Sequence, residues 1–289
     1  MSDKPAGRKK ISILDLQSKK DQGRPITMLT AYDYPSALLV DQAGIDVILV
    51  GDSLGMVVLG MESTVPVTMD EMIHHCRAVA RGAKSALLVG DMPFMSYQAD
   101  IAEAIRNAGR FLKEGHMDTV KLEGGQEVAQ TIRAIVDAGI PVMGHIGLTP
   151  QSASKLGGYR VQGKTAADAL RLLEDALAIQ EAGSYAIVLE AVPAPVAGAI
   201  SERLRVPIIG IGAGAACDGQ VLVFHDLVGL FDRFKPKFVR QYADAGKAIS
   251  SAIQSYAEDV EAGTFPAPEN TFAIDDEAWQ EFLEQLENR

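Results

Sequence analysis

Two short apolar runs, each ending in Gly-Asp, organise the hydrophobic pattern of the chain. Residues 47–50 read Val-Ile-Leu-Val without polar alternation, and Gly51 and Asp52 follow them. Residues 86–89 repeat the arrangement before Gly90 and Asp91. Such runs predict strands that are buried on both faces, as in a parallel sheet. If the two strands are neighbours, both aspartates emerge at the same edge of the sheet, within reach of one cation.

Apolar runs and helical periodicity alternate along most of the chain. Six further strands are predicted at residues 26–32, 119–123, 141–147, 186–192, 206–212 and 221–225. Helices, most of them closed by glycine, are predicted at residues 11–22, 34–43, 68–81, 98–114, 127–138, 165–182, 194–204 and 238–262. This order predicts an α/β fold, a (β/α)₈ TIM barrel with an N-terminal helix. Between the seventh and eighth strands a turn replaces the expected helix. The alternative, a doubly wound open sheet, is disfavoured because no glycine-rich fingerprint follows the first strand.

The two ends of the chain differ from its centre. Residues 1–10 are predicted to be a flexible tail, residues 11–265 the catalytic barrel, and residues 266–289 an acidic C-terminal extension. Within the extension, Trp279, Phe282, Leu283 and Leu286 follow the i, i+3, i+4, i+7 spacing of one helix face. We expect this amphipathic helix to dock against the barrel or a neighbouring subunit. The alternative is a solvated, partly disordered tail.

Composition narrows the class of protein. With 289 residues and 47% hydrophobic content, the chain is long enough for one barrel domain with a sizeable core. Its net charge of −11 argues against nucleic-acid partners and anionic membrane surfaces. No apolar segment is long enough to span a membrane, and no apolar core follows the N-terminal lysines as in a secretory signal. Cys76 and Cys217 form neither a metal-ligand spacing nor a disulfide framework, so we expect a cytoplasmic protein.

The predicted strand ends carry an unusual concentration of ionisable groups. They are Asp52, Asp91, Lys121, Glu123, His145 and Glu190, with Ser53 beside the first. Each one alone has an ordinary structural explanation, such as a turn, a helix cap, an ion pair or a core histidine. Together they leave uncompensated negative charge, because buried charges are costly unless they are paired or bound to a metal. A divalent cation at this rim would neutralise that charge.

Oxygen ligands without paired Cys or His favour Mg²⁺ over Zn²⁺. Asp52 and Asp91 are the expected direct ligands, and Glu123 is expected to be a water-bridged or outer partner. The metal would polarise a substrate carbonyl and acidify the neighbouring carbon. Lys121 and Ser53 are suited to hold a substrate carboxylate, and Glu190 is the expected general base.

Eight short motifs give the chain a recognisable resemblance. They are residues 28–34 (MLTAYDY), 51–56 (GDSLGM), 91–95 (DMPFM), 121–125 (KLEGG), 144–151 (GHIGLTPQ), 157–159 (GGY), 189–190 (LE) and 209–214 (IGIGAG). From about residue 11 to about residue 266, the chain resembles the ketopantoate hydroxymethyltransferase family. The resemblance implies a barrel of the phosphoenolpyruvate-enzyme type, Mg²⁺, 5,10-methylenetetrahydrofolate as one-carbon donor, and a homo-oligomer, typically a decamer. It says nothing about the acidic extension.

The resemblance also implies roles for individual residues. Asp52 and Asp91 correspond to metal ligands, with Glu123 close to the metal. Asp52, Ser53, Asp91 and Lys121 correspond to contacts with the 2-oxoacid. Glu190 corresponds to the proton acceptor, and His145 is an active-site neighbour. The implied reaction converts 3-methyl-2-oxobutanoate to 2-dehydropantoate, a step of pantothenate biosynthesis. No basic groove or aromatic pair in the sequence identifies where folate binds.

Two other functions remain open at this point. The first is a Mg²⁺-dependent lyase or mutase resembling isocitrate lyase, which would place a cysteine acid near a strand end. Here Cys76 is expected on a helix and Cys217 in a loop, which disfavours that reading. The second is a non-enzymatic barrel that binds an oxoacid as a sensor or assembly component. Exchange of the substrate C3 hydrogen would separate an enzyme from such a sensor.

Overall fold

The computed structural model describes residues 8–155, 157–231, 233 and 236–289, which fall into two compact units. The first unit is Met1–Tyr242 and the second is Ala243–Arg289. The sequence predicted that the barrel domain extends to residue 265, whereas the first unit ends at Tyr242. Helix α10 (Ala245–Ala262) belongs to the second unit, and none of its residues is buried.

Eight parallel strands close into a barrel in chain order, with the last strand pairing back to the first. Their bounds are β1 Ile26–Thr30, β2 Val47–Val50, β3 Leu87–Asp91, β4 Thr119–Glu123, β5 Val142–Gly147, β6 Ala186–Glu190, β7 Ile208–Ile211 and β8 Gly219–Leu222. The predicted (β/α)₈ barrel is confirmed, and the open doubly wound sheet is excluded. No helix lies between β7 and β8 in the described residues, as predicted.

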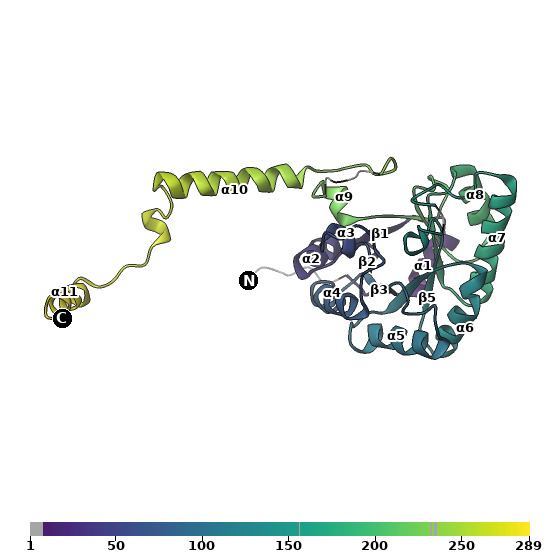
Figure 1. The fold of residues 1–289 in the computed structure, drawn as a ribbon, viewed down its shortest axis with the longest axis horizontal. Coiled ribbons are helices and arrows are strands. Elements are labelled where there is room, and N and C mark those ends of the chain that lie inside the picture. Colours follow the sequence, from purple (N-terminus) through teal and green to yellow (C-terminus); the bar gives the residue numbers. More distant parts are fainter. Residues whose placement is uncertain (1–7, 156, 232, 234–235) are drawn as a thin grey trace. The chain divides into compact units, whose positions relative to one another are not determined.

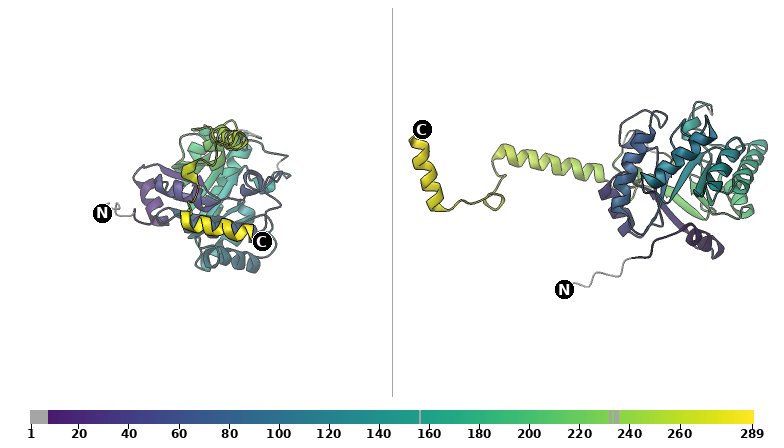
Figure 2. Two further views of the ribbon diagram at one scale, coloured as in Figure 1. Left: turned by 90° about the vertical axis from the view of Figure 1, so that its left-hand side faces the viewer. Right: turned by 90° about the horizontal axis from the view of Figure 1, so that it is seen from below.

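Helices surround the strands of this unit (Figures 1 and 2). Their bounds are α1 Ile13–Asp21, α2 Tyr34–Gln42, α3 Leu54–Val57, α4 Met69–Gly82, α5 Ile101–Lys113, α6 Ala129–Asp137, α7 Ala166–Glu181, α8 Ala194–Arg203 and α9 Phe224–Val228. Short 3₁₀ turns occupy Gln126–Val128 and Pro150–Ser152, and a third lies at Pro268–Asn270 in the second unit. A capping box begins α4, because the side chains of Thr68 and Glu71 each accept a hydrogen bond from the other residue's backbone N–H.

Two predicted elements are displaced along the chain. The eighth strand was expected at 221–225, but His225 belongs to α9, which begins where the Phe224 N–H bonds the hydroxyl of Thr30 at 2.9 Å. The last long helix was expected from residue 238, but α10 begins at Ala245, where Asp244 caps it by accepting from the Lys247 N–H. Both boundaries depend on hydrogen bonds that apolar periodicity does not reveal.

The N-terminal segment is anchored as far as the structure describes it. Residues 1–7 of the predicted tail lie outside the described residues. Arg8 forms a 2.9 Å ion pair with Asp46, and Lys10 forms a 2.6 Å ion pair with Asp118. Residues 8–10 are therefore tied to the barrel rather than forming part of a free tail.

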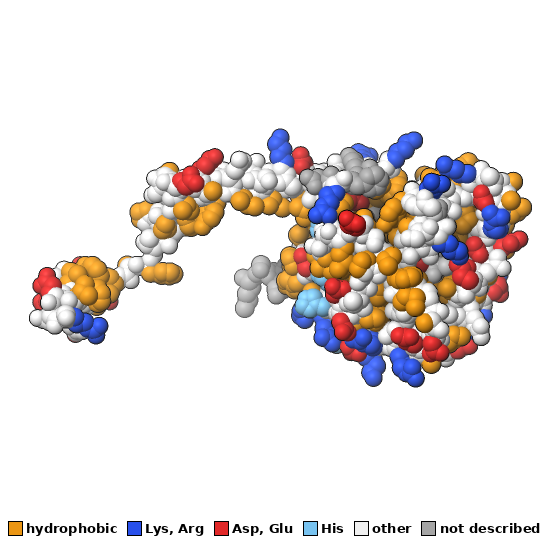
Figure 3. All heavy atoms as spheres, viewed as in Figure 1, with side chains coloured by type: hydrophobic (Ala, Val, Ile, Leu, Met, Phe, Trp, Pro, Cys, Tyr) orange, Lys and Arg blue, Asp and Glu red, His pale blue; other side chains and the backbone are white. Residues whose placement is uncertain are grey.

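The second unit contains two helices with exposed apolar side chains. In α10, Ile249, Ile253, Tyr256 and Val260 are all exposed. Helix α11 (Asp276–Glu287) is the amphipathic helix that the sequence predicted, and three of its four predicted apolar residues are exposed. Apolar side chains along α10 are visible in Figure 3. Among the described residues, no helix combines the length and apolarity that crossing a bilayer requires.

Alternate residues of each strand pack in two different hydrophobic clusters. This alternation determines whether a site side chain points into the barrel or toward the helices. In β2, Val47 and Leu49 pack in one cluster with β3 residues Leu87 and Val89, whereas Ile48 and Val50 join the cluster under the helices. Because side chains alternate along a strand, Asp91 continues the row of Leu87 and Val89 into the barrel interior.

The same alternation applies to the strands that follow. Lys121 and Glu123 lie two residues apart on β4. His145 lies two residues after Met143 on β5, and Glu190 lies two residues after Val188 on β6. Met143 and Val188 both belong to the cluster in the barrel interior that contains Leu87 and Val89. The register aligns these residues side by side, since Asp91 pairs with Lys121 and Glu123 pairs with His145. The charged side chains at the strand ends therefore point into the same barrel interior.

A close approach between β3 and α5 sets the position of the strand that carries Asp91. A Cβ atom added at Gly90 would lie 2.3 Å from Cδ1 of Phe111, which is fully buried. On the same helix, a Cβ added at Gly109 would meet nothing within 4 Å. Only the first glycine is required by packing.

We expect Gly90→Ala to lower the free energy of unfolding by about 1–3 kcal/mol, because overpacking forces the strand and helix apart. Gly109→Ala is the matched control and should raise it by about 0.5–1 kcal/mol, since alanine stabilises a helix interior. Urea denaturation followed by circular dichroism measures both. Equal effects of the two substitutions would contradict the packing argument, and Phe111→Leu should partly rescue Gly90→Ala.

Candidate active site

Two buried aspartates and a lysine form the centre of the site. The backbone N–H of Asp52 donates to Oδ2 of Asp91 at 3.1 Å, which joins the ends of β2 and β3. Oδ1 of Asp91 lies 2.7 Å from Nζ of Lys121 in an ion pair. All three side chains are buried. The structure thus brings together the aspartate pair that the sequence placed at one sheet edge.

A second group of charges lies beside the first, on β4 to β6. Nδ1 of His145 is 3.4 Å from Oε1 of Glu123 and 3.2 Å from Nζ of Lys121. On its other side, Nε2 of His145 lies 3.2 Å from Oε2 of Glu190. His145 therefore connects the predicted general base to the lysine and Glu123.

Ser53 joins the site through a residue that the sequence analysis did not select. Its hydroxyl lies 2.8 Å from that of Tyr32, which is buried at the end of β1. Tyr32 occurs in one of the motifs of the resemblance, but no role was assigned to it. Its place at the end of an apolar run gave no reason to separate it from an ordinary core tyrosine.

Gln151 and Tyr97 are buried polar residues that hold the carboxylates in place. Nε2 of Gln151 donates to Oδ2 of Asp52 and to the carbonyl of Met92, each at 2.9 Å. Its backbone N–H donates to Oε2 of Glu123 at 3.0 Å. The hydroxyl of Tyr97 lies 2.8 Å from Oε1 of Gln151, which fixes the orientation of the amide. The only sequence signal for Gln151 was its place in a motif, because its partners lie 28 to 99 residues away.

Burial and mutual repulsion perturb the ionisation of the aspartates. Burial raises the pKa of Asp52 well above its usual value, and the charges of Asp91 and Glu123 raise it further. Burial also raises the pKa of Asp91, although Lys121 opposes that effect. Burial alone would lower the pKa of Lys121, but the carboxylates of Asp91, Glu123 and Asp52 outweigh it and raise the pKa. Negative charge in this interior is therefore poorly compensated by the protein alone.

The donor set fits a hard divalent cation held by two carboxylates. Asp52 and Asp91 supply buried oxygen donors, and Mg²⁺ needs only one or two protein carboxylates beside water and substrate oxygens. Both oxygens of Glu123 already face protein donors, Gln151 and His145, which suits an outer partner better than a direct ligand. Among the described residues, no group of three or more His, Cys, Asp and Glu side chains is arranged as a metal cluster.

The backbone around Glu190 is closely packed. Its carbonyl accepts the Leu148 N–H at 2.9 Å, and Ala191 adopts a positive φ of 49°. A Cβ added at Gly147 would lie 2.3 Å from the Glu190 carbonyl oxygen, so only glycine fits there. The end of β6 is therefore fixed against β5, which holds Glu190 beside His145.

Several solved structures share the fold of this barrel. Phosphonopyruvate hydrolase matches with a TM-score of 0.59 at 14% identity, over 96% of this chain and 99% of that one. A 2,3-dimethylmalate lyase of the PEP mutase/isocitrate lyase superfamily matches with a TM-score of 0.55 at 13% identity, over 94% and 98% of the two chains. The fold is that of the barrel enzymes of this superfamily.

Sequence comparison identifies the family within that class. The ketopantoate hydroxymethyltransferase family model matches residues 10–268. A 3-methyl-2-oxobutanoate hydroxymethyltransferase of Moorella thermoacetica is 60% identical over 267 residues, covering 92% of this chain and 99% of the relative. The chain belongs to the ketopantoate hydroxymethyltransferase family and is accordingly a transferase.

The acidic extension lies beyond the family model from residue 269 onward, but a relative aligns with part of it. A 3-methyl-2-oxobutanoate hydroxymethyltransferase of Nitratidesulfovibrio vulgaris (strain DP4) is 53% identical over 283 residues, covering 98% of this chain and 92% of the relative. An alignment of that length leaves out at most six of the 289 residues and must run into the extension.

His145 should titrate far above an ordinary histidine. Burial and the Lys121 charge lower its pKa, but hydrogen bonds with Glu123 and Glu190 outweigh them and raise it from 6.5 to about 9. The stability that protonated His145 contributes is present in full below pH 6.5 and lost as pH rises through about 9. Imidazole NMR of the metal-free protein should show one ring titrating near pH 9.

The resonance near pH 9 should disappear in His145→Gln. His225 is the internal control, because burial lowers its pKa below 6.5. Its ring should titrate on the acid side and vanish in His225→Gln. If all five histidines titrated between pH 6 and 7.5, the contacts that raise the His145 pKa would be absent in solution.

Proposed function

We propose that this hydroxymethyltransferase converts 3-methyl-2-oxobutanoate to 2-dehydropantoate, with 5,10-methylenetetrahydrofolate as one-carbon donor and Mg²⁺ as cofactor. The observation that carries the proposal is the arrangement of Glu190 and His145 in one barrel interior with the Asp52–Asp91 pair and Lys121. Family membership supplies the type of reaction. The donor set supports the choice of metal.

Each group in the site has a task in this scheme. Asp52 and Asp91 would hold the metal, which when bound polarises the keto group of the oxoacid. Lys121 and Ser53 would hold the substrate carboxylate, the first through its ammonium charge and the second through its hydroxyl. Glu190 takes the C3 proton, and the resulting carbon nucleophile attacks the methylene carbon of the donor after one of its two C–N bonds has opened. Water then replaces the remaining nitrogen on that carbon, which leaves the hydroxymethyl group on the product and releases tetrahydrofolate.

His145 has a supporting task rather than that of the base. At neutral pH it is protonated, because its pKa is about 9. Protonated His145 forms an ion pair with Glu190, with 3.2 Å between Nε2 and Oε2, and this contact fixes the direction of the Glu190 side chain. The same cation offsets part of the charge of Glu123, whose Oε1 lies 3.4 Å from Nδ1 of His145.

The cysteines do not support the lyase or mutase alternative. Cys76 is fully buried in α4, and burial raises the pKa of its thiol well above the usual value. Burial raises the pKa of Cys217 to about 11. Neither thiol has the lowered pKa of a reactive cysteine, and neither belongs to a barrel strand: Cys76 lies within α4 and Cys217 lies between β7 and β8.

We expect 2-dehydropantoate to form when the protein is supplied with the oxoacid, methylenetetrahydrofolate and Mg²⁺. A chelator should abolish turnover, and added Mg²⁺ should restore it, because the carbonyl would otherwise lack an electrophilic partner. Product formation is followed by mass spectrometry. Absence of product under metal-replete conditions would refute the proposed reaction.

A half-reaction isolates the role of Glu190. In D₂O without folate, the wild-type protein should exchange the C3 hydrogen of 3-methyl-2-oxobutanoate. Glu190→Gln should slow this exchange by about 10²–10⁴-fold, as expected for loss of a general base. Glu202→Gln on α8 is the control and should leave exchange unchanged. A non-enzymatic oxoacid sensor would show no exchange in either protein.

We also propose that the chain forms a homo-oligomer, a decamer by analogy with the family resemblance. The support from the structure is the exposed apolar face of α10, made by Ile249, Ile253, Tyr256 and Val260. These residues recur at i, i+4, i+7 and i+11, so they share one side of the helix. A continuous apolar face of this kind is costly in water and is typical of an interface.

Sedimentation velocity tests this assembly. Ile253→Glu should shift the protein to smaller species, because it places a charge in the proposed interface. Ser255→Glu is the matched control, since residue 255 lies about 200° around the helix from residue 253 and faces away. A wild-type protein that sediments as a monomer would contradict the proposal.

A further inference from the structure

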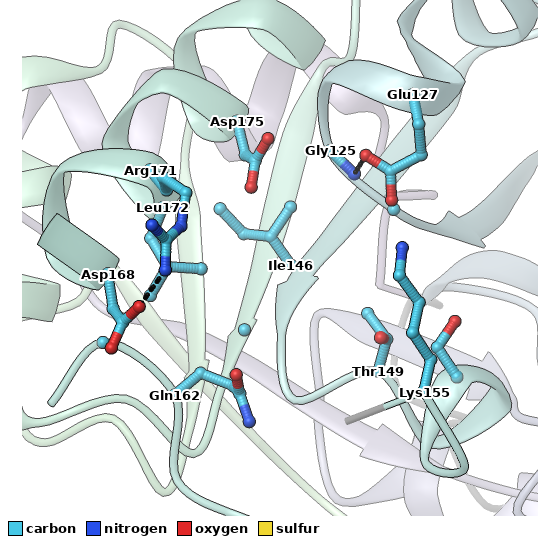
Figure 4. A pocket seen from close by; sticks show the side chains of 14 residues that line it. Gly125, Glu127, Ile146, Thr149, Lys155, Gln162, Asp168, Arg171, Leu172 and Asp175 are labelled. Atoms are coloured by element: carbon cyan, nitrogen blue, oxygen red, sulfur yellow. Dashed lines mark hydrogen bonds and ion pairs between the residues drawn. The ribbon is translucent and has the colours of Figure 1, made fainter. Parts of the chain in front are cut away.

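The two substrates of the proposed reaction must meet at one carbon, which limits where the one-carbon donor can approach. A cavity of about 330 Å³ lies between helix α7 and the ends of β4 and β5 (Figure 4). It lies on the outer side of β5, because Ile146 lines it and packs in the cluster under the helices, whereas His145 points inward. The strand therefore separates this cavity from the reacting groups.

The barrel interior offers no second route, because its lower part is filled by apolar side chains. Residues from six of the strands form this buried cluster, among them Leu49, Val89, Met143, Val188 and Ile209. The donor must therefore approach through the mouth of the barrel, the opening at the carboxyl ends of its strands.

The loop between β5 and α7 returns to this mouth beside the proposed base. The backbone N–H of Gln162 donates to the carbonyl of Ala191 at 2.9 Å, and Ala191 directly follows Glu190. A few residues earlier, Gly157 and Gly158 adopt positive φ angles of 72° and 104°, which turn the chain before it reaches this point. The segment between the glycines and the bond to β6 therefore lies at the rim of the site.

Tyr159, within this segment, reaches the opposite side of the mouth. Its hydroxyl donates to Sδ of Met56 at 3.9 Å, and the N–H of Met56 donates to the carbonyl of Ser53 at 3.0 Å. Strands β2 and β6 stand four apart in a closed barrel of eight, so their ends face each other across the opening. Tyr159 thus bridges the mouth between the side that carries Glu190 and the side that carries Asp52.

The ring of Tyr159 is accessible although it lies over the charged groups. The residue is 52% exposed. Burial of the remainder raises the pKa of its hydroxyl, and the charges of Asp52, Glu190 and Glu123 raise it further. The hydroxyl is therefore within electrostatic reach of the reacting groups, while much of the side chain is open to a ligand.

This combination selects a flat ligand that enters after the oxoacid pocket is formed. An aromatic ring and a thioether both present polarisable apolar surface, on which flat heterocycles stack. The oxoacid is small and is held deeper, by the metal and Lys121. The folate donor carries a pterin whose pyrimidine half is flat, and its reactive methylene carbon is attached next to that ring system. A pterin that lies on Tyr159 therefore brings this carbon to the mouth above Glu190.

We propose that Tyr159 is the wall against which the pterin ring of the folate donor lies, with Met56 beside it. The inference rests on the proposed function, since it names the residue that receives the second substrate of that reaction. The donor then covers the oxoacid from the side of the mouth, and its methylene carbon faces the carbon that Glu190 deprotonates.

Tyr159→Leu tests this role, because leucine keeps an apolar side chain but removes the aromatic face. We expect the KM for 5,10-methylenetetrahydrofolate to rise on the order of 5- to 100-fold, as for loss of a stacked base. Calorimetry with tetrahydrofolate should show the same loss of affinity. The KM for 3-methyl-2-oxobutanoate and the folate-independent C3 exchange in D₂O should stay within about twofold of wild type.

Two further variants sharpen the test. Tyr159→Phe keeps the ring and removes only the bond to a weak sulfur acceptor, so its KM for the folate should stay within about threefold of wild type. Tyr34→Leu is the matched control, since Tyr34 is 49% exposed and lies on α2, and it should change neither KM.

Three results would overturn the inference. The first is an unchanged KM for the folate in Tyr159→Leu. The second is an equal loss in Tyr159→Phe, which would assign the effect to the hydroxyl. The third is loss of C3 exchange in Tyr159→Leu, which would show that Tyr159 supports the oxoacid site instead. Failure of the proposed function is a different result, because wild-type protein would then show no exchange.

Discussion

The structure depends on holding three buried carboxylates and one lysine in the interior of a barrel. Asp52, Asp91 and Glu123 are each about 5% exposed or less, as is Lys121. Burial raises the pKa of both aspartates, and the charge of Glu123 raises it further. The protein tolerates this cost because each group is fixed by neighbours: Asp91 by Lys121, Glu123 by His145, and Asp52 by Gln151.

This arrangement explains how one fold can support two tasks at one opening. The aspartate pair on β2 and β3 lies where a cation would be attracted, whereas the histidine and glutamate on β5 and β6 form a pair suited to proton transfer. Lys121 lies between them, 2.7 Å from Asp91 and 3.2 Å from His145. Parallel strands in register set this order, because each contributes one or two inward side chains at its carboxyl end.

The strand ends could be predicted from the sequence because a buried strand appears as a short run of apolar residues. The alternation of side chains between its two faces also depends only on neighbouring positions in the chain. Val47 to Val50 and the Gly-Asp that follows define both the strand and the direction of its end. Gln151 and Tyr97 could not be found in this way, since their hydrogen bonds join residues far apart in the chain. The displaced start of α10 and the helical position of His225 have a related cause, because capping and tertiary hydrogen bonds override apolar periodicity.

Gln151 gives the site a mechanical property beyond its role in orienting carboxylates. The side-chain amide of Gln151 donates to Asp52 and to the Met92 carbonyl, and its backbone N–H donates to Glu123. These bonds hold the segment after β5 against the ends of β2, β3 and β4. That segment therefore cannot swing away as an independent flap without exposing several buried polar groups at once. Moving Gln151 away would leave the Asp52 and Glu123 carboxylates and the Met92 carbonyl without this donor, so the position of the segment and the positions of these three groups depend on one another.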